Sequence, residues 1–507
     1  MQRRHFLQVL AAAAATASGT ATAKPARADR FTAAFESQPL LRPFKGVGDA
    51  TGDLQGRALL RGRWPTELRG RFYRNGPALF ERGGERYHHW FDGDGMVQQF
   101  TIGNGEVTHR GRLVQTTKLR AELAAGRFLM SAFGTQVDGT PPVGGPDAFN
   151  TANTNALEHA GRVLALWEGG SAWALDPKDL STQGPVTWGK DLAQVPFSAH
   201  PKVDAAGHLW NIGTFGKAMV VWHIDPAGQL VKVQVGESPY PGGMVHDMAV
   251  TARWVVVPLP PIQLQFNKPF GPDGNGVGPR PFAMDAGQPL RVLVMDKNDI
   301  TKRRVFELPP QMVFHVGNAH ERSDGRIVLS FIGVPDAWFL NEGAVALMQG
   351  REQADGAASS TQLLTLDMAS GRVQQHRFDN DAEFPRVDPR RVGQRTRWLL
   401  TGTGWDVHAS RQHHALLHGV QLLDTETGRQ RRFDHGEHAI VEEHVFVPKP
   451  GKTGELDAWL LGTTFDARRQ ATVLNLLDAA HIEDGPIAQA VLPYLLPPGF
   501  HGNFTAA

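Results

Sequence analysis

Short apolar runs separated by turn residues recur along most of the chain. Runs at 162–167, 254–257, 290–296 and 325–330 each have a length typical of a strand. Gly, Asp or Asn stands at the ends of many of these runs. Segments such as Asp225-Pro226-Ala227-Gly228 and Asp424-Thr425-Glu426-Thr427-Gly428 indicate hairpin turns. The pattern therefore predicts many short antiparallel strands joined by tight turns.

Helical periodicity is rare in this sequence. The strongest example predicts a helix from Lys118 to Phe133, with apolar positions at Leu119, Leu123, Phe128 and Leu129. Many strands, few helices and the absence of a linker-like break favour a single closed all-β domain over residues 29–507. A β-propeller fits this length better than one sandwich. No strict repeat is visible, so the periodicity alone leaves several sandwiches as an alternative.

Two segments interrupt the strand pattern with long loops. Pro258 to Pro289 is rich in Pro and Gly and carries Phe266, Phe270 and Phe282, while Val334 to Met348 carries Trp338, Phe339 and Leu340. Apolar side chains on such loops either line a pocket entrance or pack beneath the loop itself. The sequence leaves both readings open.

Composition narrows the function classes. Lys and Arg number 52 and Asp and Glu number 51, so the net charge of +1 lacks the basic excess of a nucleic-acid binder. No apolar run reaches the ~20 residues of a membrane span. With 0 Cys, disulfides, thiolate nucleophiles and iron–sulfur clusters are excluded, and any metal must be held by His, Asp or Glu.

The first residues have the pattern of an export signal. Arg3-Arg4 followed by Phe6-Leu7 resembles a twin-arginine motif, and an Ala-rich stretch and the small-residue sites at 21–23 and 26–28 follow. We therefore expect residues 1–28 to be a signal peptide and the protein to be periplasmic. This route carries folded proteins, which suits an enzyme that acquires its metal in the cytoplasm.

Four histidines stand in ordered contexts far apart in the chain. They are His200 in Ser-Ala-His-Pro-Lys, His246 in Val-His-Asp-Met, His315 in Phe-His-Val-Gly-Asn and His501 in Phe-His-Gly-Asn-Phe. The spacing matches no local metal motif, so each would come from a different structural unit. A closed ring of blades is a fold that can bring such distant positions together on its axis.

Other histidines are denser locally but lie among charged residues. We interpret these as mostly blade-edge or surface positions: His413, His414, His418, His435, His438 and His444. A zinc site from His414 and His418 would need a helix between them, which the intervening Ala-Leu-Leu permits.

Seven motifs in order resemble the carotenoid cleavage oxygenase family. Phe72-Tyr73-Arg74-Asn75-Gly76-Pro77 and 87–96 match its opening signature, and the four His contexts match its iron-ligand motifs. Glu383-Phe384-Pro385-Arg386 and the ending from Leu492-Pro493 to Phe504 match as well. The resemblance runs from about Pro39 to Phe504. It implies a seven-bladed β-propeller with a few helices and long loops capping the active-site face, and a non-haem Fe(II) held by His200, His246, His315 and His501.

The resemblance also implies three Glu residues that accept hydrogen bonds from ligand imidazoles. They match Glu168, Glu383 and Glu443. The family commonly has Gly-Glu-Pro at the third position, whereas this chain has Glu442-Glu443-His444. Glu443 keeps the spacing to Phe446-Val447-Pro448 and is preferred over Glu442. Such carboxylates fix the imidazole tautomer and offset the metal charge.

These observations together predict an Fe(II) dioxygenase that cleaves a C=C bond of a carotenoid or apocarotenoid with O2. The alternatives are a lignostilbene-type dioxygenase of the same superfamily and a propeller that only binds a lipophilic molecule. Stilbene-cleaving relatives have Lys directly before the first of the three Glu, where this chain has Trp167. We expect Trp167, Phe91 and Phe133 to line an apolar substrate tunnel, and the 119–133 segment to make peripheral membrane contact.

Overall fold

The structure is a computed structural model, and it describes residues 26–27, 29–48, 53–141, 144–240, 244–264, 282–351, 356–404, 412–413 and 416–507. The predicted signal peptide lies outside the described residues except for Ala26 and Arg27. His414, one of the two residues weighed for a zinc site, also lies outside them.

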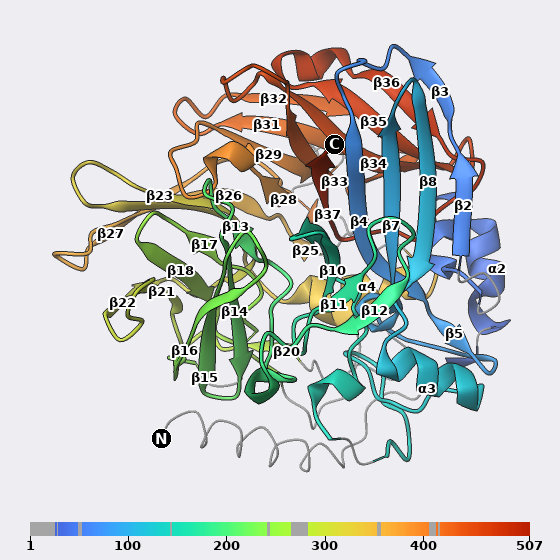
Figure 1. Cartoon of the computed structure of the whole chain (residues 1–507), viewed down its shortest axis with the longest axis horizontal. Helices are drawn as coiled ribbons and strands as arrows, with labels where there is room; N and C mark the ends of the chain where they lie inside the picture. The colour runs from blue at the N-terminus through green and yellow to red at the C-terminus, as the bar shows by residue number, and fades with distance from the viewer. Residues whose placement is uncertain are drawn as a thin grey trace.

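Seven antiparallel sheets surround a central axis, as the predicted seven-bladed propeller requires (Figure 1). Five of them have four strands each, taken consecutively or nearly so from the chain. The first two such blades are β9 (Asn155–His159), β10 (Arg162–Leu166), β11 (Trp173–Leu175) and β12 (Thr182–Pro185), then β13 (Lys202–Val203), β14 (Leu209–Phe215), β15 (Ala218–Ile224) and β16 (Leu230–Glu237).

Three further four-stranded blades follow in chain order. They are β17 (Ala249–Val250), β18 (Trp254–Leu259), β21 (Leu290–Asp296) and β22 (Arg303–Leu308); β23 (Met312–Glu321), β24 (Ile327–Val334), β26 (Ser360–Leu366) and β27 (Val373–Arg377); and β28 (Glu383–Arg386), β29 (Trp398–Thr403), β31 (Gly419–Asp424) and β32 (Gln430–Asp434). In each blade the first strand in the chain is an edge strand of its sheet.

The two remaining blades close the ring by joining both ends of the chain. The C-terminal strand β37 (His501–Ala506) pairs with β4 (Gly70–Leu79), followed across the sheet by β7 (Asp94–Gly103), β8 (Glu106–Leu113) and β2 (Asp53–Arg57). The N-terminal strand β3 (Leu59–Gly62) in turn pairs with β36 (Pro486–Val491), beside β35 (Ala471–Asp478), β34 (Ala458–Asp466) and β33 (Ala439–Pro448). Each end thus completes a blade that the other end began.

Small sheets and short helices cover one face of the ring. The sheets are β1 (Ala26–Arg27) with β6 (Glu85–Arg86) and β5 (Glu81–Arg82), β19 (Ile262–Leu264) with β20 (Phe282–Met284), and β25 (Gly356–Ala357) with β30 (Gln412–His413). The helices include α2 (Asp29–Ser37), α3 (Thr117–Ala125), α4 (Ala344–Met348), the π-helix η6 (Phe339–Gly343), and the 3-10 helices η1 (Pro39–Lys45) and η3 (Trp90–Asp92). The other 3-10 helices are η4 (Pro146–Ala148), η5 (Lys190–Leu192), η7 (Pro389–Arg391) and η8 (Ala479–Asp484). Of these, η8 does not belong to this cover and packs against the blade strands β32, β34 and β35.

Apolar side chains fill the spaces between neighbouring blades and beneath the helical cover. Phe72, Phe100, Leu461 and Leu474 belong to one inter-blade cluster. Phe35, Phe44 and Leu347 belong to a cluster that ties the N-terminal segment to α4. Burying such side chains is the main stabilising contribution to the fold, at roughly 25 cal/mol per Å².

The predicted helix over Lys118 to Phe133 is shorter in the structure. Thr116 caps α3 by accepting a hydrogen bond from Leu119 N at 3.1 Å, and the helix ends at Ala125 because Gly126 takes the left-handed conformation. Leu119 and Phe128 are buried, so the segment presents no continuous apolar face; Leu123 is 36% exposed. Within the described residues, no helix is both long and apolar enough to span a membrane.

Candidate metal centre

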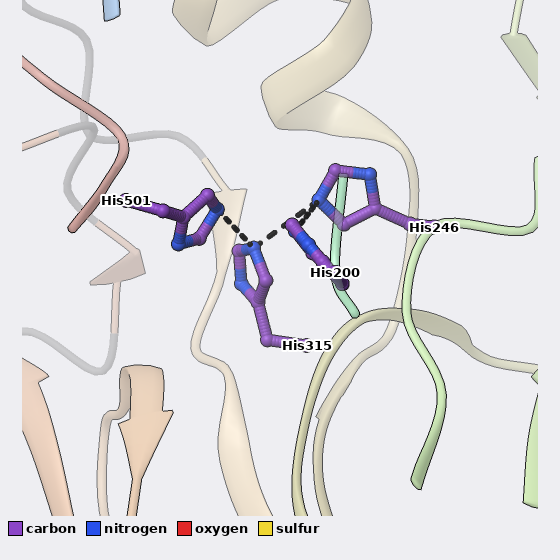
Figure 2. A group of neighbouring side chains, drawn as sticks. All are labelled: His200, His246, His315 and His501. Carbon is purple, nitrogen blue, oxygen red and sulfur yellow. Dashed lines mark hydrogen bonds between the residues drawn. The ribbon is translucent and has the colours of Figure 1, made fainter. Parts of the chain in front are cut away.

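The inner edges of the blades bring the four predicted histidines together. His315 lies on β23 and His501 begins β37, while His200 and His246 lie in the segments that lead into β13 and β17. Figure 2 shows their rings converging from four separate chain segments. The four side chains are buried, and one potential ligand atom from each lies within 4.8 Å of the others. Sequence positions that are far apart thus form one compact nitrogen cluster.

The Nε2 atoms of the four rings face one another. His200 Nε2 lies 3.1 Å from His246 Nε2, and His315 Nε2 lies 3.2 Å from the Nε2 atoms of both His246 and His501. His246 and His315 are therefore the two inner members of the group, each with two close Nε2 neighbours. The arrangement leaves the Nδ1 atoms pointing outward, toward the surrounding protein.

A glutamate carboxylate lies within hydrogen-bond distance of three of the four Nδ1 atoms. Glu168 Oε1 lies 2.9 Å from His246 Nδ1, Glu383 Oε2 lies 2.5 Å from His315 Nδ1, and Glu443 Oε1 lies 2.9 Å from His501 Nδ1. These are the three Glu residues named from the sequence, each beside a different histidine. The Nδ1 atom of His200 has no polar partner among the described residues.

Burial and the carboxylates set the charge of this cluster. Burial lowers the pKa of His200 well below its ordinary value and that of His501 to about 4. Burial is also the largest single influence on His246 and acts in the same direction, but the carboxylates of Glu168, Asp247 and Glu383 together outweigh it and raise the pKa of His246. Burial alone would raise the pKa of Glu443, yet Arg386 and His501 hold it well below its ordinary value.

The donor set fits a bound cation. A carboxylate beside Nδ1 keeps the imidazole proton on Nδ1, so the Nε2 atoms of His246, His315 and His501 each present a lone pair. With the protons on Nδ1, the facing Nε2 lone pairs of His246 and His315, and of His315 and His501, lie 3.2 Å apart and repel one another. A cation bound by the four nitrogens removes the repulsion, and the neutral imidazoles are the form that a metal requires.

Residues that the sequence reasoning did not single out hold the ligand segments in register. Asp247 accepts a hydrogen bond from Val316 N at 2.8 Å, which links the residue after His246 to the residue after His315. Asn155 donates to Ala199 O at 2.7 Å and accepts from Asn503 at 3.1 Å, which links the segments of His200 and His501. The His-Asp and His-Gly-Asn contexts contain two of these residues and were the available signal.

A strained residue lies against the cluster. Phe384 has a φ of 54°, a left-handed conformation that costs a non-Gly residue of order 1 kcal/mol or more. In this conformation Phe384 N donates to Glu383 Oε2 at 2.7 Å, and its ring lies 5.2 Å from the ring of His315 and 5.3 Å from that of His501. The strain is concentrated where the carboxylate and the two imidazoles are positioned.

An apolar cavity of about 340 Å³, the apolar cavity hereafter, opens onto the cluster. His246, His315 and His501 form part of its wall. The three tunnel candidates from the sequence, Trp167, Phe91 and Phe133, all line it, together with Trp90, Phe314, Phe339 and Phe500. Phe133 stacks on Phe282 with ring centroids 4.8 Å apart. Phe282 and Phe339 come from the two loop segments, so both segments contribute to this region.

Some of the remaining histidines are placed differently from the sequence interpretation. His418 and His444 are buried, at 5% and 3% exposure, and are not blade-edge or surface positions. Backbone carbonyls satisfy their polar atoms in the interior. His418 Nδ1 donates to Ala439 O at 2.7 Å, and His444 Nδ1 donates to Glu442 O at 2.9 Å. Polar neighbours in the sequence therefore gave a wrong indication of exposure at these two positions.

Glu442 is buried but turns away from the histidines. It pairs with Arg74 at 2.6 Å, accepts from Gly499 N at 3.1 Å and contacts the Thr463 hydroxyl. Consecutive strand residues point to opposite faces, so Glu443 alone of this pair reaches His501. The role of Glu443 as the third carboxylate beside a metal ligand stays a prediction.

Comparison with known proteins gives relatives that match nearly the whole chain. Apocarotenoid-15,15'-oxygenase of Synechocystis sp. is 29% identical over 484 residues, which are 88% of this chain and 92% of the relative. Lignostilbene-alpha,beta-dioxygenase isozyme III of Sphingomonas paucimobilis is 29% identical over 494 residues, 92% of this chain and 96% of the relative.

Solved structures agree with the sequence relatives. The crystal structure of cobalt-substituted Synechocystis ACO has a TM-score of 0.81 and 26% identity, covering 92% of this chain and 98% of that one. The family model described as retinal pigment epithelial membrane protein matches residues 50–506. This chain therefore belongs to that family, the carotenoid cleavage oxygenases, and is an oxidoreductase of the oxygenase class.

Proposed function

We propose that this protein is a non-haem Fe(II) dioxygenase that cleaves a C=C bond of a carotenoid or apocarotenoid with O2 to give two carbonyl products. The observation that carries the proposal is the junction of a four-imidazole cluster with an apolar cavity walled by aromatic rings. A purely structural metal site is normally closed by its ligands, whereas this cluster faces a cavity of about 340 Å³. This argues against a propeller that only binds a lipophilic molecule.

Iron is the proposed metal, held by His200, His246, His315 and His501. All-nitrogen ligation suits a borderline divalent metal such as Fe(II), and four neutral imidazoles leave its positive charge intact. The carboxylates of Glu168, Glu383 and Glu443 offset that charge from outside the ligand set. When bound, the iron supplies the redox chemistry that activates dioxygen.

The rest of the chain binds and orients the substrate. Aromatic side chains exclude water from the apolar cavity and stack along a conjugated chain, which places one double bond beside the histidines. The charged residues among the described lining, apart from histidine, are the carboxylates Glu168, Glu383 and Glu442. No side chain is assigned as a general acid or base in this proposal.

The lining of the apolar cavity favours a polyene over a hydroxystilbene. Its described residues include no Lys, Arg or Tyr to bind a phenol hydroxyl, and Trp167 stands directly before Glu168. A lignostilbene-type activity is the second candidate, and the relative from Sphingomonas paucimobilis supports it. Burial of a polyene at roughly 25 cal/mol per Å² favours the first.

We expect apocarotenoids to be cleaved with a higher kcat/KM than hydroxystilbenes, by about tenfold or more. The measurement is a side-by-side assay at equal iron loading, with products identified by mass. Trp167→Lys supplies the missing cation and should raise hydroxystilbene cleavage, while Trp167→Phe serves as the uncharged control. Rapid cleavage of hydroxystilbenes without cleavage of any apocarotenoid would replace the first candidate by the second.

We also propose export to the periplasm by a twin-arginine route, on the evidence of Arg3-Arg4 and the following Ala-rich stretch. Replacing both arginines by Lys keeps the charge and should retain the precursor in the cytoplasm. Cell fractionation with detection of the mature chain measures this. Mature protein appearing in the periplasm at the normal level would contradict the route.

Peripheral membrane contact is proposed for the surface beside α3, because a carotenoid-type substrate partitions into lipid. Leu123 is exposed and Leu129 is half-buried there, whereas Phe133 lines the apolar cavity. The double variant Leu123→Ser, Leu129→Ser therefore tests the contact, whereas a change at Phe133 would also alter the apolar cavity. Liposome flotation should decrease in this variant while its metal content stays unchanged.

A further inference from the structure

Two cavities meet at the four-histidine cluster from different sides. Besides the apolar cavity, a second one of about 150 Å³, the polar cavity hereafter, touches His200, His315 and His501. His200 lines only the polar cavity and His246 only the apolar one, while Phe384 lines both. The imidazoles and this phenylalanine ring thus form a partition between two spaces.

The polar cavity has charged and amide walls. Lys202 Nζ pairs with Asp247 Oδ1 at 2.8 Å, and Arg386 pairs with Glu443 at 2.7 Å. The side chains of Lys202 and Arg386 are 19% and 25% exposed, so this cavity communicates with solvent. The apolar cavity, in contrast, has no cationic Lys or Arg among its described lining residues.

A hydrated cation keeps more polar contacts in the polar cavity than in the apolar one. In the apolar cavity the carboxylates Glu168, Glu383 and Glu442 are set in a wall that is otherwise largely aromatic and aliphatic, so much of the hydration shell is lost there at a cost of many kcal/mol. Carboxylates and amides replace that shell step by step. In the polar cavity, Asp247 and Glu443 provide oxygen atoms, and Asn155 and Asn503 provide amides, on the approach to the imidazoles.

We propose that hydrated divalent cations reach and leave the four-histidine cluster through the polar cavity, and that the apolar cavity is reserved for the organic substrate. The inference rests on the proposed function in taking the cluster as a metal site. In this proposal the charges of the Lys202–Asp247 pair set how fast a cation enters the polar cavity. The side chain of Val392 in its wall limits the space through which the cation passes. Metal exchange and substrate binding then use separate routes.

The steric test enlarges one residue in each cavity. Val392, half-buried in the wall of the polar cavity, is replaced by Trp, and Thr214 in the wall of the apolar cavity is replaced by Trp as the matched control. Metal-free full-length protein is mixed with Co(II), and the visible absorption of the bound ion is followed in time. Release is followed after addition of a chelator.

Val392→Trp should slow both uptake and release about tenfold and leave the final occupancy unchanged, because a barrier on the route raises the activation energy in both directions. Thr214→Trp should leave both rates unchanged and weaken the binding of a retinoid probe. Val392→Ala should keep or increase the rates. Unchanged rates in a folded Val392→Trp protein, or slow exchange in Thr214→Trp, would overturn the route.

The electrostatic test does not depend on a bulky side chain. Lys202→Met leaves the Asp247 carboxylate without its cationic partner and makes the polar cavity more negative. Co(II) uptake should therefore be several-fold faster, with the largest gain at low ionic strength. Lys202→Arg keeps the charge and should retain the original rate. Equal rates for Lys202→Met and Lys202→Arg at all salt concentrations would exclude the assigned control.

Failure of this inference is distinguishable from failure of the proposed function. If the unsubstituted chain binds no Co(II), the four-histidine cluster is not a metal site and the proposed function fails. If Co(II) binds at one ion per chain and the variants exchange it at the original rate, only the assigned route fails.

Discussion

Replacing His315 by Ala should abolish metal binding and cleavage activity together. His315 is, with His246, one of the two inner members of the cluster, since its Nε2 atom lies 3.2 Å from those of both His246 and His501. Its loss removes one of the four proposed nitrogen ligands and also leaves the Glu383 carboxylate without its imidazole partner. Iron per chain, measured by elemental analysis after purification, should fall from about one to near zero.

His320→Ala provides the matched control because it changes a histidine on the same strand, β23. His320 is half-buried and lies outside the cluster, so the iron content and the activity should stay at their original level. His246→Ala should behave like His315→Ala. Full iron occupancy in both cluster variants would show that these residues are not the ligands.

The architecture could be predicted from the sequence only in part. Short strands and tight turns indicated a closed all-β fold, but the number of blades came from the family resemblance because no strict repeat is visible. Ring closure depends on β37 pairing with β4 and on β3 pairing with β36. Such pairings join opposite ends of the chain, and local patterns do not encode them.

The site was more accessible to sequence reasoning than the fold details. The four histidines and three carboxylates stood in recognisable contexts, and the structure brings them together. The helix expected to continue to Phe133 ends at Ala125, where Gly126 takes the left-handed conformation; Gly126 is a helix-ending signal in the sequence that the apolar periodicity did not take into account. Burial of His418 and His444 was missed because their partners are carbonyl oxygens, which carry no sequence signature.

Substitutions at the neighbouring residues Glu442 and Glu443 should affect different properties: stability at Glu442 and metal affinity at Glu443. They lie side by side on β33, where the pairing with β34 shifts register between Val441 and His444. Glu443 contacts His501, Arg386 and Gly502 N, whereas Glu442 contacts Arg74 and Gly499 N. One carboxylate therefore orients an imidazole, and the other fixes the segment that precedes it.

Glu443→Gln should lower metal affinity by ~10–100-fold, because the amide removes the charge that favours the Nδ1 tautomer of His501. Glu442→Gln leaves the contact with His501 intact but strands the buried Arg74 guanidinium, which should lower the free energy of unfolding by about 3–5 kcal/mol. Competition with a chelator measures the affinity, and thermal unfolding of the metal-free protein measures the stability. Glu443→Gln should therefore show the larger loss of metal affinity, and Glu442→Gln the larger loss of stability. A larger loss of metal affinity in a folded Glu442→Gln protein than in Glu443→Gln would place the third carboxylate at Glu442 instead.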